Sequence, residues 1–126
     1  MYIKKILVAI FALIPAITFS QNYNDYELST LKFVASGQSS TTQGEDLAIA
    51  QNALGIRYFN GSGGAPKDLQ TAAYWFEKSA TNGHVYGQYN IAWRYYHGQG
   101  VAKNYSKALY WFEKAGNQFI TYMKYE

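Results

Sequence analysis

The sequence of 126 residues contains no cysteine. This absence excludes disulfides, thiol nucleophiles, thiolate metal sites and attachment of a lipid to an N-terminal cysteine. Only two prolines occur, and charged residues make up only 15% of the chain. Aromatic residues, by contrast, make up 18%, with 13 tyrosines and 3 tryptophans. The length is enough for one small domain, and the scarcity of proline suits a mostly helical chain.

The N-terminus has the three parts of a secretory signal peptide. Two lysines form a basic region, residues 6–17 are apolar throughout, and Thr18 and Ser20 place small residues at positions −3 and −1 of a cut before Gln21. We therefore expect cleavage near Ser20, which would remove residues 1–20 and leave a periplasmic or secreted protein. The apolar run is too short for a comfortable membrane span, so we expect no stable span after cleavage. An uncleaved anchor is the alternative.

Removal of this signal peptide changes the charge of the chain. Lys4 and Lys5 are two of the 11 basic residues, so nine would remain against 8 acidic residues, and the net charge would fall from +3 to +1. Nucleic-acid binding usually requires a basic patch or stripe. The small excess gives no support to it, so we expect no nucleic-acid partner.

Residues 50–118 contain one unit written twice. Arg57-Tyr58 matches Arg94-Tyr95 at an offset of 37 residues, whereas the run YWFEK at 74–78 returns at 110–114 at an offset of 36. One extra residue in the first turn explains the slip. Self-similarity at this period is typical of helical repeat arrays. The sequence therefore predicts an all-α fold, an α/α solenoid of tandem helix-turn-helix repeats.

Repeat one, residues 44–83, predicts two helices joined by a glycine-rich turn. We expect the first helix over residues 45–60 and the second over residues 69–81, from the spacing of apolar residues. Gly61 stands where a left-handed C-terminal cap is expected. Asp68 is placed to cap the second helix, because a short acidic side chain can accept hydrogen bonds from the first turn.

Repeat two, residues 84–118, follows the same design, with helices expected over residues 86–97 and 105–115. The tail over residues 117–126 has apolar residues at helical spacing, and we expect it to start a third first-helix that is cut short. Its last part, residues 119–126, would then act as a capping tail.

The N-terminal part of the mature chain, residues 22–43, predicts a capping helix and a polar loop. One helix is expected from Asn22 to Ser36 with Asp25 as its N-cap, as a worn version of the second helix of the repeat. The repeat domain over residues 21–126 then holds two full repeats between degenerate caps. If the caps fail to close the ends, we expect a homodimer through an open end of the solenoid.

The repeated pattern A-x-x-x-L-G-x-x-Y-x-x-G-x-G, followed by A-x-x-W-F-x-K-A, resembles the Sel-one-like repeat (SLR) family, relatives of tetratricopeptide repeats. In repeat one the matching positions are Ala50, Leu54, Gly55, Tyr58, Gly61, Gly63, Pro66, Lys67, Asp68, Ala72, Trp75, Phe76, Lys78, Ala80 and Gly83. In repeat two they are Ile91, Ala92, Tyr95, Gly98, Gly100, Val101, Lys103, Asn104, Ala108, Trp111, Phe112, Lys114 and Ala115.

Three departures from the family pattern concern capping and packing. Asn104 stands where the family has Asp, Ala92 where it has Gly, and Gly116 where it has the second Ala of the closing pair. The resemblance implies a solenoid whose concave face is lined by the first helices. It also implies an adaptor that binds a protein or peptide, in bacteria often in the periplasm or outside the cell.

Two stripes on the first helices differ between the copies and are therefore free to serve a partner. Each stripe has i, i+4 spacing and lies on one helix face, with an arginine beside it. The stripes are Asn52, Ile56 and Asn60 with Arg57, and Tyr89, Trp93 and His97 with Arg94. Because Tyr, Trp and Arg are enriched at binding hot spots, we predict that these eight residues bind the partner. Alternatively, Trp93 packs against the next helix or the tail, and both arginines are solvated.

No pattern of the sequence predicts catalysis or cofactor binding. The glycines of residues 61–64 follow a helix and lack the Gly-Lys-Ser/Thr of a phosphate loop. His84 and His97 are the only histidines, and no carboxylate pair completes a metal site with either. Glu77 and Glu113 occupy equivalent repeat positions, which favours a structural or solvated role. We therefore expect no catalytic residues, no cofactor and no metal ligands.

Three functions are compatible with this reading. The first is a non-catalytic module that binds a protein or peptide. The second is narrower: a periplasmic immunity or inhibitor protein against a toxic effector. This chain resembles small exported SLR proteins, some of which have that role. The third is a protein that binds or cleaves cell-wall fragments, since such ligands have been proposed for cysteine-rich relatives. This chain lacks their cysteines.

Overall fold

The structure is a computed structural model that describes residues 23–40 and 44–125, so the predicted signal peptide and its cleavage site lie outside the described residues. Every regular element of the described residues is a helix, which confirms the predicted all-α solenoid. The elements are η1 (Tyr23–Asp25), α2 (Leu28–Ala35), α3 (Glu45–Asn60), α4 (Leu69–Thr81), α5 (Val85–His97) and α6 (Tyr105–Tyr125). None of these helices is both long enough and apolar enough to cross a membrane.

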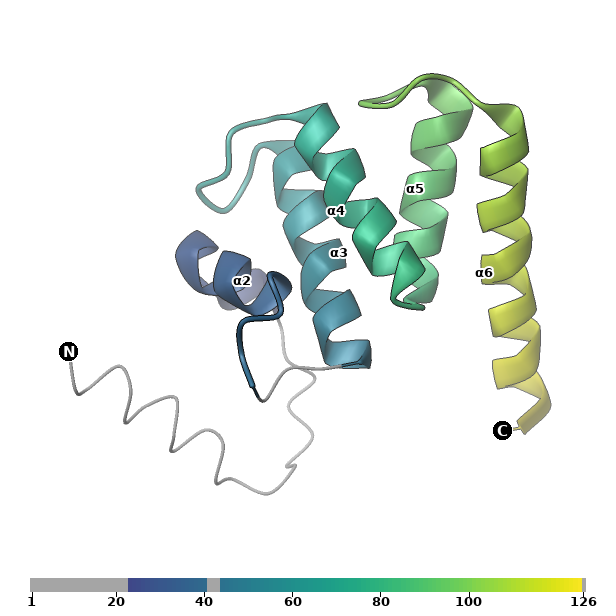
Figure 1. The fold of residues 1–126 in the computed structure, drawn as a ribbon, viewed down its shortest axis with the longest axis horizontal. Coiled ribbons are helices and arrows are strands. Elements are labelled where there is room, and N and C mark those ends of the chain that lie inside the picture. The colour runs from purple at the N-terminus through teal and green to yellow at the C-terminus, as the bar shows by residue number, and fades with distance from the viewer. Residues whose placement is uncertain (1–22, 41–43, 126) are drawn as a thin grey trace.

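The helices lie side by side in chain order, with α2 at one end of the array and α6 at the other (Figure 1). Helix α3 packs against α4 and α5 packs against α6, and α4 also packs against α5. The two hairpins therefore share one core, in which Leu54, Phe76 and Ile91 are almost fully buried. The bounds of α3 and α4 match the prediction, and α5 begins one residue earlier than predicted.

Both hairpins begin and end their helices by the same devices. Gly61 and Gly98 each have φ of 67°, the left-handed conformation that ends α3 and α5. The Asp68 carboxylate accepts two backbone N–H hydrogen bonds at 3.1 Å and the Thr71 hydroxyl at 2.8 Å, and these bonds, led by that of the hydroxyl, lower the pKa of Asp68. Asn104 caps α6 with a single backbone hydrogen bond of 3.0 Å. The predicted caps are thus confirmed.

The predicted single helix from Asn22 to Ser36 is wrong, because a non-helical stretch separates η1 from α2. The Arg57 guanidinium donates hydrogen bonds to the backbone carbonyls of Tyr23 and Tyr26. These carbonyls therefore bind a side chain of α3 instead of continuing one helix. Helix α2 begins without a side-chain cap, so the predicted N-cap role of Asp25 is also wrong.

Helix α2 nevertheless takes the place of a second helix in front of repeat one. The Gln51 side-chain amide of α3 donates to the Ala35 carbonyl at 3.2 Å. At the equivalent position of repeat two, the Gln88 amide donates to the Ala80 carbonyl of α4 at 3.3 Å. Because the same contact recurs, α2 packs on α3 as α4 packs on α5.

The predicted end of the second helix at residue 115 is wrong as well, since α6 continues without interruption to Tyr125. In repeat one, Gly83 has φ of 92° and lets the chain turn after α4. The equivalent residue in repeat two is Phe119, and a residue with a Cβ disfavours that conformation. The helix therefore runs on, and the Gln118 amide donates to the Gly83 carbonyl at 2.8 Å, which ties α6 to the end of α4.

Candidate functional site

Six ring-bearing side chains of α5 and α6 form one connected surface, which we call the aromatic cluster. Its members are Tyr89, Trp93, Tyr96, His97, Tyr105 and Phe112. Trp93 lies at its centre, with ring centroids 5.0 Å from Phe112, 5.6 Å from Tyr96 and 5.4 Å from His97. Such contacts have the offset and edge-to-face distances at which aromatic rings attract.

Much of the aromatic cluster is open to solvent. Trp93 and Tyr96 are each 43% exposed and Tyr105 is 57% exposed. His97 is also exposed, while Tyr89 and Phe112 are half-buried. Neighbouring large apolar side chains that stay exposed together are the usual mark of an interaction surface. The cluster can therefore offer rings for stacking and apolar contact, together with the polar tips of tyrosine and histidine.

The repeat-one half of the predicted binding stripe is largely built into the fold. Asn52 is 8% exposed and accepts a hydrogen bond of 2.8 Å from the Asn90 amide of α5. Arg57 is 5% exposed and is held by backbone carbonyls near the N-terminus. The prediction that these two side chains lie on an open face is wrong. Ile56 is half-buried, and Asn60 alone of this half is exposed.

Arg94 is half-buried and folds over rings of repeat one. Its guanidinium carbon is 4.0 Å from the Phe59 ring centroid and 5.8 Å from that of Phe76, so α5 places a cation over two rings of repeat one. Burial lowers the pKa of Arg94. The alternative of two solvated arginines is therefore wrong for Arg57, which is buried and binds carbonyls, whereas Arg94 is half-buried over the rings.

The repeat-two half of the stripe is the part that the structure brings together. Tyr89, Trp93 and His97 all belong to the aromatic cluster. Trp93 packs against Phe112 of the next helix, as the alternative reading expected, and still keeps 43% of its surface exposed. Trp93 therefore both packs against α6 and presents an exposed ring surface.

Sequence reasoning missed three members of the cluster, Tyr96, Tyr105 and Phe112. Phe112 matches Phe76 and so does not differ between the copies, and the other two residues lie outside the stripe. The property that would have identified them is the position of their repeat in the array. A framework residue of the last repeat keeps an open side when no further helix follows it among the described residues.

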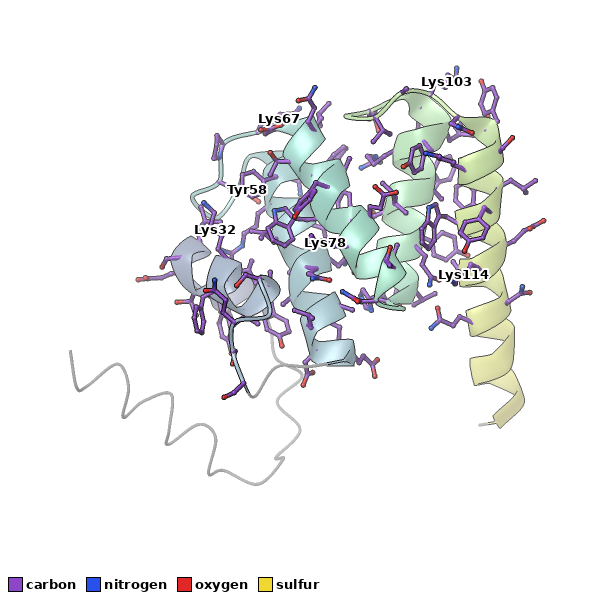
Figure 2. All side chains as sticks on the ribbon, viewed as in Figure 1. Lys32, Tyr58, Lys67, Lys78, Lys103 and Lys114 are labelled. Carbon is purple, nitrogen blue, oxygen red and sulfur yellow. The ribbon has the colours of Figure 1, made fainter. Side chains whose placement is uncertain are left out.

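A lysine lies beside the cluster. The Lys103 ammonium, at the turn between α5 and α6 (Figure 2), lies 5.0 Å from the Tyr105 ring, and a hydrogen bond to that tyrosine raises the pKa of Lys103.

Away from the cluster, between α5 and α4, the Tyr95 hydroxyl donates to Glu77 at 2.9 Å. Burial, followed by this bond, raises the pKa of Tyr95 to about 12. Among the described residues, no group of three acidic or histidine side chains could hold a metal ion.

Comparison with protein-family models finds two copies of the Sel1 repeat, at residues 48–84 and 85–118. No curated protein matches the sequence. Among solved structures, a protective antigen present in uropathogenic Escherichia coli strains, which displays an SLR fold, is 34% identical with a TM-score of 0.63. The alignment covers 75% of this chain and 18% of that one.

Two further solved structures are similar. Helicobacter pylori cysteine rich protein B is 25% identical with a TM-score of 0.60, over 73% of this chain and 65% of that one. A Sel1 repeat protein from Oxalobacter formigenes is 29% identical with a TM-score of 0.55, over 73% of this chain and 30% of that one. The chain thus spans less than two thirds of the length of each.

Proposed function

Because this chain belongs to the Sel1 repeat family, whose fold commonly mediates protein–protein interaction, we propose that it is a non-catalytic module that binds a protein or peptide. The observation that carries this proposal is the aromatic cluster of α5 and α6. Trp93 and Tyr96 are stiff, half-exposed side chains at its centre, and residues of this kind dominate binding energy at interfaces.

The proposed binding surface replaces the stripe along both first helices. It retains Tyr89, Trp93 and His97 and adds Tyr96, Tyr105 and Phe112. Arg94 has a supporting role, since its guanidinium holds α5 against repeat one. The partner would therefore meet rings from one first helix and one second helix.

We also propose that the module acts outside the cytoplasm, because residues 1–20 have the layout of a secretory signal peptide. Expression of the full chain in a bacterial host, followed by intact-mass analysis of the envelope fraction, tests this point. The expected species begins at Gln21. Recovery of a chain that still begins at Met1 in the cytoplasm would contradict export.

Affinity capture tests the binding function. The immobilised protein is challenged with envelope and secreted extracts, alongside a Trp93→Ala, Tyr96→Ala double variant and a Tyr74→Ala control. Tyr74 is as exposed as the cluster residues, at 53%, but lies on α4. Circular dichroism is recorded for all three forms to check that they remain helical.

The proposal expects one protein to be retained by the native and control forms and lost by the double variant. A retained toxic effector would select the immunity or inhibitor role. Equal retention by all three forms would place binding elsewhere on the molecule. Retention of cell-wall fragments alone would end the protein-adaptor proposal in favour of a small-ligand one.

A further inference from the structure

Repeat one shows how the outer face of one hairpin is covered by the next helix. Helix α5 lies on α3 and α4, and its Arg94 guanidinium rests 4.0 Å from the Phe59 ring and 5.8 Å from the Phe76 ring. Phe76 is consequently almost fully buried, at 1% exposed. The packing of α5 on repeat one thus has two parts, and the first is an arginine over two rings.

The other half is a close approach of backbones seven residues earlier on α5. A Cβ on Gly87 would overlap the Ser79 hydroxyl of α4, so only a residue without a side chain fits there. Between these two points the Asn90 amide donates to Asn52 at 2.8 Å. A small residue followed after seven positions by an arginine is thus the recognition pattern of this face, because that spacing returns to the same side of a helix.

The same face of repeat two carries the aromatic cluster. Helix α5 covers three residues of repeat one, and each has an equivalent in repeat two. Tyr89 and Tyr96 are the equivalents of Asn52 and Phe59 at an offset of 37 residues, and Phe112 is the equivalent of Phe76 at an offset of 36. Trp93 stands at the position of the half-buried Ile56 and touches both Tyr96 and Phe112. No helix of the described residues lies over these rings as α5 lies over repeat one.

We propose that the aromatic cluster binds an α-helix of a partner polypeptide, seated as α5 is on repeat one and carrying an arginine seven residues after a small residue. This inference rests on the proposed binding function and specifies its partner. The arginine would meet the rings of Trp93, Tyr96 and Phe112. Trp is the strongest ring for such contact with a cation, and the Lys103 ammonium already lies 5.0 Å from the Tyr105 ring of the same cluster.

A partner helix fits this face better than a second copy of the chain. The two helices of the chain that have the pattern are already engaged, since Gly87 and Arg94 are held against repeat one and Arg57 is 5% exposed. Two clusters placed face to face would bring rings against rings and supply no arginine. Neither of these two arginines is available for the contact, so we assign the arginine to a partner polypeptide.

A peptide with the sequence of residues 45–60 is a suitable probe. It is a first helix of the same repeat, with Arg57 seven residues after position 50. An Ala50→Gly change in the peptide supplies the residue without a side chain that the close approach at Gly87 requires. A side-chain staple between its positions 48 and 52, on the opposite face, keeps the isolated helix folded, and circular dichroism confirms this. The control peptide carries Arg57→Gln. Both are titrated into the full-length native protein and into its Trp93→Ala and Tyr74→Ala variants, with binding followed by fluorescence anisotropy of a dye on the peptide.

We expect the native protein and the Tyr74→Ala variant to bind the arginine peptide about five- to tenfold more tightly than the glutamine peptide, the range of a cation on an aromatic face. The Trp93→Ala variant should bind both peptides weakly and with equal affinity. Equal binding of the two peptides to the native protein, or no binding of either, would overturn the inference.

Two outcomes separate this inference from the proposed function. If neither peptide binds while capture of a natural protein still depends on Trp93 and Tyr96, the proposed function stands and the arginine-bearing helix is wrong. If sedimentation shows a dimer of the native protein that Trp93→Ala converts to a monomer, a second copy covers the cluster, and the partner-helix inference is also wrong.

Discussion

Phe76 and Phe112 occupy the same position in the two repeats and have the same sequence around them, yet their surroundings differ. Phe76 is 1% exposed because α5 and its Arg94 cover it, whereas Phe112 is half-buried beside the open rings of the aromatic cluster. Residues of a repeat therefore acquire their roles from the neighbour that follows. The same side chain is core in one hairpin and binding surface in the next.

The largest expected effect tests this difference directly. Phe76→Ala should lower the free energy of unfolding by about 4 kcal/mol, because it leaves a cavity in a closed core. Phe112→Ala should cost about half as much or less, because its ring already meets solvent. Urea denaturation of both variants measures the two values. Equal losses would mean that the outer face of repeat two is as closed as that of repeat one.

The equivalent arginines Arg57 and Arg94 should also differ in how much their replacement lowers the free energy of unfolding. Arg57→Met should cost about 3 kcal/mol, because it removes charge-assisted hydrogen bonds from buried carbonyls near η1. Arg94→Met should cost about 1 kcal/mol, since Met retains apolar contact with Phe59 and only the attraction of the cation is lost. Urea denaturation gives both values, and hydrogen exchange should show η1 opening only in the first variant. The reverse order would refute these roles.

A glycine comparison sharpens the packing argument. A Cβ on Gly55 would stand 2.6 Å from the Phe76 ring, so Gly55→Ala should destabilise the protein by about 1–2 kcal/mol despite the better helix propensity of alanine. Gly116→Ala in α6 is the matched control, because nothing lies within 4 Å of its Cβ position. It should stabilise by up to about 1 kcal/mol. Thermal unfolding of the two variants should give shifts of opposite sign.

The smallest effect concerns pH. His84 at the start of α5 stands where α3 has Leu47, and burial lowers the pKa of His84 below its usual 6.5. The unfolded chain therefore binds this proton more readily, so stability should fall as pH decreases below 6.5. His84→Leu should reduce that loss, as seen in melting temperatures from pH 7.5 to 5. An unchanged slope would show that other groups cause it.

The repeat pattern predicted the fold because it specifies local structure twice over. Asp68 and Gly61 fix helix ends through contacts within a few residues, and such contacts are visible in the sequence. The ends of the array could not be predicted in the same way. The break before α2 depends on Arg57, which reaches back to Tyr23 across 34 residues.

The candidate site was predicted in part for the same reason. Trp93 and His97 were found because they differ from their equivalents in repeat one, and difference between copies is visible in the sequence. Phe112 was missed because identity with Phe76 concealed its different burial. Asn52 was wrongly placed on an open face because its partner, Asn90, belongs to the following repeat.

Fluorine NMR tests the central claim, that repeat two presents openly the face that α5 covers on repeat one. 4-Fluorophenylalanine is incorporated at Phe76 or at Phe112, and each protein is exposed to a soluble paramagnetic agent. The signal from position 112 should broaden strongly, and that from position 76 should change little. Equal protection of both signals in the protein without a partner would contradict the claim, because it would show that the aromatic cluster is already covered.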